Sequence, residues 1–543
     1  MKLLFLAISL IFGKTIFCQA PEVLWHYDIN DMSFGNSAAE DIDNDGKLEI
    51  AFSTYRNDGM LHVLNAEDGS VVWTQNIEGC GDVAPLIHDV DKDGDFEIIL
   101  PGSCNPVTYC FDADTGYIQW ETETGGSDSP PTIGDIDNDG QLEILHGQFN
   151  GSVLCINAED GSVSWELEID AYASIQTEPA LLDVNGDGQL DFVVATWSYG
   201  DNHKIFCFNG NTRELIWETD APEDLIYHGV AYGDLENDGS IELTIGDYSG
   251  NLYCLDSENG NVHWDYKLPS GSLYIGAPTS LADLDNNGKL DVIFCDYYHL
   301  AAVNDEGELL WNYSIPEYAT AFRGASIADV NDDAFLDVTF GTSAGLIISL
   351  DGMTGEEIQS YNLAEEYGAD FDINHGCLIA DFNGDGTLDV FTVGGHAEYP
   401  DIENNYGRAY LVSWGHGNGP DWKMFRRDYR RSACVCNDSL LTDTVSVDIE
   451  NEILILQGEL IVSPNPMIEK MNVSFTLNEN AAVTLFVKDV LGNEVYVSQT
   501  MNLPTGMQYM TLNRKQLFNT APGIYLLELH VNRQIFSHSF MMK

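Results

Sequence analysis

Short apolar runs alternate with acidic, glycine-containing segments along most of the chain, and this pattern favours β-strands. The first unit has such runs at residues 37–40, 48–53, 61–65 and 70–73. Each run is too short for a helix, and turn-forming residues separate one run from the next. We therefore expect four strands per unit, which is the content of one β-propeller blade.

The first acidic segment is Asp41-Ile42-Asp43-Asn44-Asp45-Gly46-Lys47-Leu48-Glu49. Related segments recur at intervals of 46 to 52 residues. Strand-rich units repeating at this period predict a propeller or a linear array. The copies begin at Asp41, Asp89, Asp135, Asp183, Asp234, Asp283, Asp329 and Asp381.

Each segment places three oxygen-bearing side chains at alternate positions and a further acid four residues after the third. This pattern suits calcium, a hard cation that prefers oxygen ligands. It is not an EF-hand, because Phe52 stands at the twelfth position, where a Glu is required. The loop at Asp329 is the weakest, with Asn331 at its second ligand position and Ala334 in place of glycine. The predicted metal ligands, up to one ion per blade, are Asp41, Asp43, Asp45, Glu49, Asp89, Asp91, Asp93, Glu97, Asp135, Asp137, Asp139, Glu143, Asp183, Asn185, Asp187, Asp191, Asp234, Glu236, Asp238, Glu242, Asp283, Asp285, Asn287, Asp291, Asp329, Asn331, Asp333, Asp337, Asp381, Asn383, Asp385 and Asp389.

Most units end with a strand that carries a tryptophan, such as Trp73, often with a glycine four residues earlier. We expect these rings to pack between neighbouring blades. An early run at residues 23–27 matches a fourth strand with no unit before it. The fold prediction is therefore all-β, with an eight-bladed propeller closed by the Trp25 strand and a small Ig-like β-sandwich after it.

Two propeller families share these motifs. The Asp-rich loop resembles the FG-GAP repeat of integrin α-subunits, and the Gly-x-x-x-Trp ending resembles the pyrroloquinoline-quinone-type repeat, as does the segment 422–428. The resemblance covers about residues 21–433 and implies calcium in the blade loops on one face of the ring. It does not imply the quinone, because the chain lacks the adjacent cysteine pair of the quinone enzymes.

Charge and targeting signals narrow the possible partners. The formal net charge is −66 over 543 residues, which disfavours nucleic-acid binding. Residues 1–20 have the pattern of a secretory signal peptide, and no later apolar run is long enough to span a membrane. Basic residues gather at positions 423–431, either as an anion site or to neutralise the acidic ring and fix its last strand.

Cysteine positions leave one disulfide possible. Cys80 and Cys104 lie in neighbouring loops and could pair in an oxidising compartment. Cys434 and Cys436 are too close in sequence for an easy mutual bridge. Cysteines that recur inside strands are expected to be buried and unpaired: Cys110, Cys155, Cys207 and Cys254.

The chain changes character after the repeats. Residues 434–459 form a polar, acidic predicted linker, and residues 460–543 contain short alternating runs typical of a β-sandwich. Four ordered motifs, at residues 463–466, 489–492, 523–526 and the terminal Lys543, resemble the C-terminal sorting domain of the type IX secretion system. The resemblance implies a Bacteroidota protein that the type IX machinery exports to the extracellular space or the outer-membrane surface.

Aromatic side chains concentrate in the loops that lie opposite the Asp-rich loops in a propeller, the face where ligands usually bind. We prefer a binding or adhesion module for glycan or protein ligands, without catalytic residues. The alternatives are a polysaccharide lyase acting on a uronate-containing glycan, in which Tyr227 or His228 abstracts a proton near Arg323, and a structural spacer without a ligand. The candidate ligand-binding residues are Trp197, Tyr199, Tyr227, His228, Tyr297, Tyr298, Arg323 and His396.

Overall fold

The computed structural model divides into two compact units, separated near residue 445. The described residues are 20–436, except 199, 201, 270–273 and 418, and 461–542, except 464–466, 468–469, 478–480, 489–493, 499–500, 504, 518–522 and 532–533. The predicted signal segment and nearly all of the predicted linker therefore lie outside the described residues. So do Lys543 and the sorting motif at 489–492.

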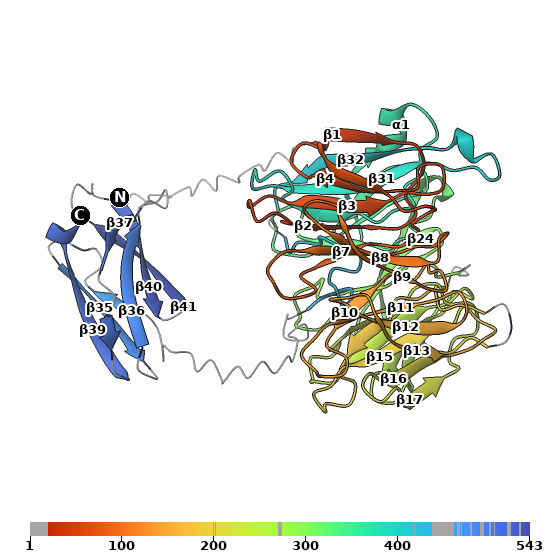
Figure 1. The fold of residues 1–543 in the computed structure, drawn as a ribbon. Coiled ribbons are helices and arrows are strands. Elements are labelled where there is room, and N and C mark those ends of the chain that lie inside the picture. Colours follow the sequence, from red (N-terminus) through yellow and green to blue (C-terminus); the bar gives the residue numbers. More distant parts are fainter. Residues whose placement is uncertain are drawn as a thin grey trace, which may run out of the picture. The chain divides into compact units, whose positions relative to one another are not determined.

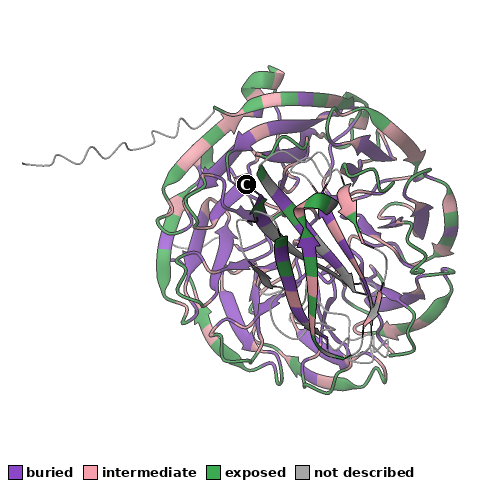
Figure 2. Cartoon of the chain, turned by 90° about the vertical axis from the view of Figure 1, so that its left-hand side faces the viewer, coloured by how far each residue is buried: buried purple, intermediate pink, exposed green. Residues whose placement is uncertain are grey.

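The first unit is a ring of small antiparallel sheets (Figures 1 and 2). Four consecutive strands form each sheet, as predicted from the repeat, except where the chain ends meet and where a late parallel strand joins the sixth sheet as its fifth strand. The first strands lie nearest the axis, and they are β2 (Ser37–Glu40), β6 (Leu86–His88), β10 (Thr132–Gly134), β14 (Ala180–Leu182), β18 (Ala231–Gly233), β22 (Ser280–Ala282), β26 (Ser326–Ala328) and β30 (Leu378–Ala380).

The second and third strands are also mostly buried. The second strands are β3 (Glu49–Ser53), β7 (Glu97–Pro101), β11 (Glu143–Gly147), β15 (Asp191–Ala195), β19 (Glu242–Gly246), β23 (Asp291–Asp296), β27 (Asp337–Gly341) and β31 (Leu388–His396). The third strands are β4 (Met60–Asn65), β8 (Val107–Asp112), β12 (Ser152–Asn157), β16 (Ile205–Asn209), β20 (Leu252–Asp256), β24 (His299–Val303), β28 (Leu346–Leu350) and β32 (Tyr406–Gly415).

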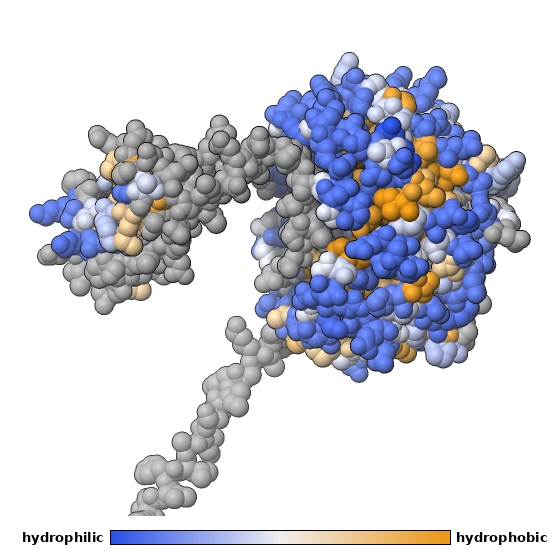
Figure 3. Space-filling model, turned by 90° about the horizontal axis from the view of Figure 1, so that it is seen from below, coloured by the Kyte–Doolittle hydropathy of each residue, from blue (hydrophilic) through white to orange (hydrophobic). Residues whose placement is uncertain are grey.

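The fourth strands form the rim, where buried and exposed side chains alternate (Figure 2). Polar side chains cover most of the side seen in Figure 3, and apolar patches lie among them. Isolated exposed apolar residues such as Val71 and Leu215 are ordinary on a protein surface. The rim strands are β5 (Val71–Asn76), β9 (Ile118–Glu123), β13 (Val163–Glu168), β17 (Leu215–Thr219), β21 (Val262–Tyr266), β25 (Leu309–Ser314), β29 (Glu357–Asn362) and β1 (Glu22–Ile29).

Strand β1 closes the ring, because it pairs antiparallel with β32 in the sheet that also contains β30 and β31. Trp25 pairs with Leu411 and Tyr27 with Ala409. The prediction that the Trp25 strand completes the last sheet is therefore confirmed. Short helices lie in the loops: η1 (Pro316–Tyr318), α1 (Leu363–Tyr367) and η2 (Ile402–Asn404).

The Gly-x-x-x-Trp repeat joins neighbouring sheets. Trp73 Nε1 donates a hydrogen bond to the Ala113 carbonyl in the next unit at 2.7 Å. Gly116 lies against the same indole with φ 70°, and a Cβ atom there would be 2.5 Å from the ring. The same contact is made by Gly69 with Trp25, Gly161 with Trp120, Gly260 with Trp217, Gly307 with Trp264 and Gly355 with Trp311.

Two units depart from this pattern in compensated ways. Arg213 occupies the glycine position with φ 61°, and its guanidinium lies 5.9 Å from the Trp165 ring. Gln359 replaces the tryptophan of the seventh unit, and its side-chain amide donates to the Trp414 carbonyl. The link between neighbouring sheets thus persists where the motif is lost.

Substituting Gly116 by alanine should destabilise the ring by about 1–3 kcal/mol, because the new Cβ would meet Trp73 in a left-handed backbone conformation. Gly368→Ala is the matched control, since its φ is 82° with no atom within 4 Å of the new Cβ. Denaturant unfolding should show the larger loss for Gly116→Ala. Equal losses would mean that backbone strain alone, and not the indole contact, explains the glycine.

Residues 419–436, called the plug below, cross the axis of the ring. Trp422 forms a β-bridge with Ile379 in β30, and Met424 forms one with Ala38 in β2. Strand β33 (Cys434–Val435) pairs in parallel with β22. The plug therefore ties together the inner strands of sheets that are far apart in the sequence.

The arginines of the plug are buried and bonded to the ring. Arg426 donates to the Glu178 carboxylate and to the Gly229 carbonyl. Arg431, with no exposed surface, donates to the Pro131 carbonyl at 3.1 Å. Because protein acceptors already bind these guanidinium groups, the structural interpretation of the basic segment is favoured over an anion site.

Both disulfides lie in the first unit. Cys80 and Cys104, whose pairing the sequence left open, are bonded to each other, with a Cα–Cα distance of 5.1 Å. The expectation for Cys434 and Cys436 was wrong, because they are bonded to each other. Residues i and i+2 of an extended strand point to the same side, and their Cα atoms lie 5.3 Å apart, within the usual range.

The second unit contains two sheets that share one apolar core. The strands predicted in this region are present, with two further short ones. The first sheet contains β34 (Ile461–Ser463), β35 (Lys470–Leu477) and β39 (Gly506–Asn513). The second contains β36 (Ala481–Lys488), β37 (Glu494–Val497), β38 (Met501–Leu503), β40 (Gly523–Val531) and β41 (Gln534–Met542), and η4 (Arg514–Gln516) follows β39. A search of the described residues finds no helix with the length and apolar character of a membrane span.

Candidate functional site

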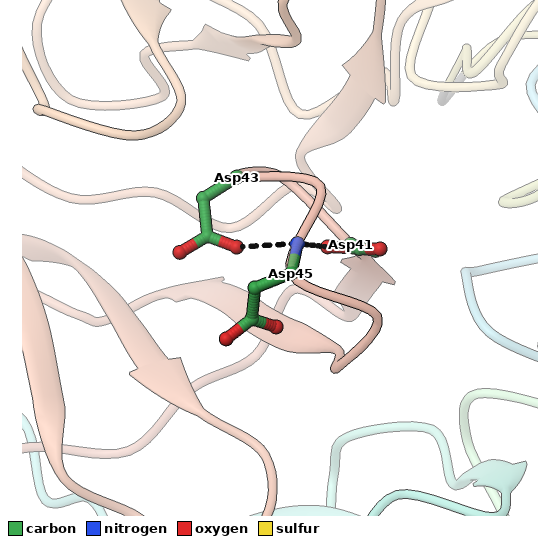
Figure 4. Close-up of side chains that lie close together, drawn as sticks. All are labelled: Asp41, Asp43 and Asp45. Carbon is green, nitrogen blue, oxygen red and sulfur yellow. Dashed lines mark hydrogen bonds between the residues drawn. The ribbon is translucent and has the colours of Figure 1, made fainter. Parts of the chain in front are cut away.

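The Asp-rich loops connect the first strand of each sheet to the second, at one face of the ring. Asp41 accepts hydrogen bonds from the amides of Asp45 and Gly46 at 3.0 and 2.9 Å. Asp43 accepts from the same Asp45 amide at 3.1 Å, so three carboxylates surround one tight turn (Figure 4). The backbone therefore holds oxygen ligands on one side of the loop.

The acid that closes each loop is buried at the start of the second strand. Glu49 is 4% exposed and accepts one hydrogen bond from the Ile42 amide at 3.2 Å. Burial, and then the neighbouring aspartates, raise the pKa of Glu49 to about 7. The same causes raise the pKa of the other closing acids: Glu97, Glu242, Asp291 and Asp389 to about 7, Glu143 and Asp337 to about 8, and Asp191 to about 6.

These buried carboxylates fit a cation. Within the described part of the chain, the buried atoms Asp137 Oδ1 and Asp337 Oδ1 have no hydrogen-bond partner. A buried charged group without a partner is costly, and a bound cation would offset that cost. The donor set is all oxygen, as calcium requires.

The loops differ in how closely their carboxylates gather. Groups of three carboxylate oxygens lie within 4.8 Å of one another in the loops that begin at Asp41, Asp89, Asp135 and Asp283. Glu236, in the loop at Asp234, instead forms an ion pair with His263 at 3.2 Å. Asparagine supplies one of the predicted ligands in three other loops, at Asn185, Asn331 and Asn383.

The loop at Asp329 keeps the shared backbone geometry despite its altered sequence. Ala334 adopts φ 71°, in the left-handed region that glycine occupies in the other loops. Its amide donates to Asp329 at 2.9 Å, as Gly46 does to Asp41. Alanine at position 334 therefore raises the conformational free energy of the turn without changing its backbone shape.

The opposite face contains a cavity of about 310 Å³, called the axial pocket below. It is formed by loops that join the fourth strand of one sheet to the first of the next, and the second strand to the third. Its lining is mainly aromatic, with a few polar groups: Phe34, Tyr55, Asp82, Tyr227, Phe322, Arg323, Ala397, Glu398, Tyr399 and Asn405.

Two carboxyl groups lie in or beside this pocket. The Oδ1 atoms of Asp82 and Asp128 are buried and lack hydrogen-bond partners among the described residues. Burial first, and the charge of Asp128 second, raise the pKa of Asp82 to about 8, although the guanidinium of Arg323 acts in the opposite direction. Near neutral pH, one proton on this pair together with Arg323 leaves the group with little net charge.

The loop that carries Asp82 is fixed to its neighbours. The Asp82 amide donates to Ser103 Oγ at 3.0 Å, and the Cys80–Cys104 disulfide joins the same two loops. Arg56 Nε donates to Cys104 Sγ at 3.2 Å. The Cys80–Cys104 disulfide therefore fixes the loop that carries Asp82, one member of the acid pair.

The three residues proposed for a lyase lie together. The Arg323 guanidinium is 5.9 Å from the Tyr227 ring, and the Tyr227 and His228 rings are 4.9 Å apart. His228 is only 5% exposed, and burial lowers its pKa to about 4. Burial also raises the pKa of Tyr227, so neither side chain is suited to act as a base near neutral pH.

The other predicted ligand residues divide between two places. Trp197 contacts Tyr227 with ring centroids 5.4 Å apart, and Tyr297 and Tyr298 continue the same aromatic cluster. His396 instead stacks on Tyr406, with ring centroids 5.6 Å apart. Tyr199 lies outside the described residues.

Sequence reasoning missed the acids of the axial pocket. Asp82 and Asp128 each stand three residues before a proline, Pro85 and Pro131, in the loop after a fourth strand. This shared offset was the available signal that both side chains point to one face. Tyr55 and Phe34 carry no such signal, because their loops differ in length from the corresponding loops of other units.

A ring of four-stranded antiparallel sheets defines a β-propeller. The chain belongs to the PQQ-type repeat family described as outer membrane protein assembly factor BamB, whose model matches residues 22–198 and 201–444. The secretion system C-terminal sorting domain matches residues 462–543, which confirms the predicted sorting domain. The protein is therefore a secreted or cell-surface propeller with a sorting tail for the type IX machinery.

Individual relatives are distant. The outer membrane protein assembly factor BamB of Yersinia pestis is 23% identical over 269 residues, 47% of this chain and 62% of that protein. The lambda-carrageenase of Pseudoalteromonas carrageenovora is 28% identical over 118 residues, 22% of this chain and 12% of that enzyme. The chain thus spans less than two thirds of these relatives' lengths.

A solved structure of a europium-containing methanol dehydrogenase superposes with a TM-score of 0.53 at 12% identity, covering 72% of this chain and 93% of that one. At this identity the likeness concerns the fold alone.

Proposed function

We propose that this protein is a calcium-stabilised, eight-bladed propeller that binds a neutral glycan in its axial pocket. The observation that carries the proposal is the 310 Å³ cavity with aromatic walls and converging polar groups. In this proposal, residues 21–433 form the blades, residues 434–459 link them to the tail, and residues 460–543 form an Ig-like sandwich that serves as an export tag.

The calcium part of the proposal rests on the closing acids. Glu49 and its counterparts are buried beside further carboxylates, where several negative charges would repel one another without a cation. The resemblance of these loops to FG-GAP repeats supports the same assignment. We expect the strongest sites where three carboxylates already converge, at Asp41, Asp89, Asp135 and Asp283.

The preference for a neutral sugar follows from the charges of the pocket. Sugar hydroxyl groups can donate to the Asp82 carboxyl group and accept from Arg323, which both line the pocket, while Tyr55 and Tyr227 offer ring faces for stacking. A uronate or sulfated sugar would bring a further negative charge close to the acid pair. This repulsion argues against the uronate lyase. The raised pKa of Tyr227 and the lowered pKa of His228 also argue against it, because neither side chain is then suited to act as the base.

The sugar-binding proposal predicts that Arg323→Ala and Asp82→Asn weaken glycan binding by about tenfold or more, because the first removes a charged donor from the pocket and the second replaces a carboxyl group by an uncharged amide. Calorimetry with the calcium-loaded protein and a panel of neutral oligosaccharides measures the effect. Asp114→Asn is the matched control, because it removes an exposed carboxylate in the β8–β9 turn at the other face.

This panel, together with an assay on an acidic polysaccharide, decides among the alternatives. If no sugar bound, a spacer without a ligand would be the better account of the fold. Release of unsaturated uronate from an acidic polysaccharide, lost in Tyr227→Phe, would establish the lyase instead.

A further inference from the structure

A continuous row of aromatic rings leads away from the axial pocket, and we call it the tyrosine ribbon. It starts at Tyr227 in the pocket wall and passes to Trp197 and then Tyr248, with ring centroids 5.4 and 5.2 Å apart. The remaining contacts are Tyr248–Tyr274 at 4.7 Å, Tyr274–Tyr297 at 4.5 Å, Tyr297–Tyr298 at 4.2 Å and Tyr298–Tyr318 at 5.9 Å.

The ribbon is presented to solvent on the pocket's face of the ring. Its residues come from the β15–β16, β17–β18, β19–β20, β21–β22, β23–β24 and β25–β26 loops, which lie at the ends of the strands opposite the Asp-rich loops. Tyr318, at the outer end, is 84% exposed. The rings between it and the pocket are partly exposed, so each retains some accessible surface.

Backbone strain supports a role beyond packing. Tyr297 and Tyr318 have φ values of 47° and 57°, in the left-handed region that bulky residues rarely adopt. Glycine or asparagine would form these turns at lower cost. Exposed side chains held in strained conformations are typical of binding surfaces.

We propose that the tyrosine ribbon extends the axial pocket into a groove for a linear neutral glycan, so that the ligand is a polymer several sugar units long rather than a terminal sugar. This inference rests on the proposed sugar site, because the ribbon begins at Tyr227 in the pocket wall. Consecutive sugar rings would stack on successive tyrosines, and the phenol hydroxyl groups would bind sugar hydroxyls.

A proline-rich peptide is the competing occupant, because such peptides also dock on rows of aromatic rings. The pocket at the inner end favours the glycan. Asp82 and Arg323 line that end, and sugar hydroxyl groups can donate to the carboxyl group and accept from the guanidinium, whereas a polyproline backbone has no donor. Nucleic acid is disfavoured by the net charge of −66.

The test measures how binding affinity depends on the length of the sugar, in the wild type and in variants that lack one ring of the tyrosine ribbon. Titrations use the calcium-loaded full chain with cello-, laminari-, manno- and chito-oligosaccharides, from monosaccharide to octasaccharide. The expected result is that affinity rises with length in the wild type. Tyr298→Ala and Tyr318→Ala should each weaken binding of the longest sugars about two- to tenfold and leave the shortest unaffected.

Tyr117→Ala is the matched control, since Tyr117 is 72% exposed in the β8–β9 turn at the opposite face and should not change binding. Melting curves of all three variants should match the wild type, because the substituted rings are at least partly exposed.

Each other outcome has a distinct meaning. If ribbon variants bound every length as the wild type does, the extension would be wrong and the pocket proposal would stand. If no sugar bound, the pocket proposal would fail, and the extension with it. If a polyproline peptide bound instead and lost affinity in Tyr298→Ala and Tyr318→Ala, the ribbon would be a peptide site.

Discussion

Excess chelator is expected to lower the melting temperature of the propeller by about 10 °C or more. Each ion that binds only the folded state adds about 2–3 kcal/mol at a hundredfold excess over its dissociation constant, and several loops contribute at once. Without the ion, Glu49 and its counterparts remain buried among unscreened carboxylates. Scanning calorimetry with and without calcium measures the shift.

The chelator effect should be larger at pH 8 than at pH 5.5. The pKa of Glu97 is raised to about 7 and that of Glu143 to about 8, above their ordinary values near 4.3. Between the unfolded and folded pKa values the metal-free folded state binds more protons than the unfolded state, so its stability rises as the pH falls. Protons then replace part of the missing cation, and the two melting curves approach each other.

Substitutions in single loops provide the control for the chelator experiment. Asp89→Ala should reduce the calcium-dependent part of the stability more than Asp329→Ala, because the Asp89 loop gathers three carboxylates and the Asp329 loop has Asn331 among its ligands. A melting curve that excess chelator leaves unchanged would contradict the calcium proposal.

Replacing Arg426 by methionine is expected to destabilise the ring by about 3–5 kcal/mol, because it leaves a buried acid without its partner. Arg426 is 2% exposed and donates to Glu178 and to the carbonyls of Gly229 and Val230. Burial alone would raise the pKa of Glu178, but the Arg426 charge lowers it overall and keeps the carboxylate ionised.

Denaturant unfolding of a double-mutant cycle tests this pair. Glu178→Gln combined with Arg426→Met should recover part of the loss, because the double variant removes the uncompensated charge. A loss below about 1 kcal/mol for Arg426→Met would show that the plug contributes little to the stability of the ring.

The regular parts of this protein could be predicted from the sequence because they depend on local interactions that repeat. The alternation of short apolar runs predicted the strands, and the orphan run around Trp25 predicted the closure of the ring. The Asp-rich loops were recognisable because their acidic side chains lie within nine residues, so spacing alone brings Asp41, Asp43 and Asp45 together.

Tertiary structure alone decided the axial features, because they join residues from distant units. Asp82, Asp128 and Arg323 come from different loops and meet only when the ring closes. Likewise, the basic segment around Arg426 shows no partner in sequence, since its acceptors lie about 200 or more residues away. Local patterning determines which strands and loops form, whereas the convergence of the inner strands on one axis determines which side chains share the pocket and which lie buried in the plug.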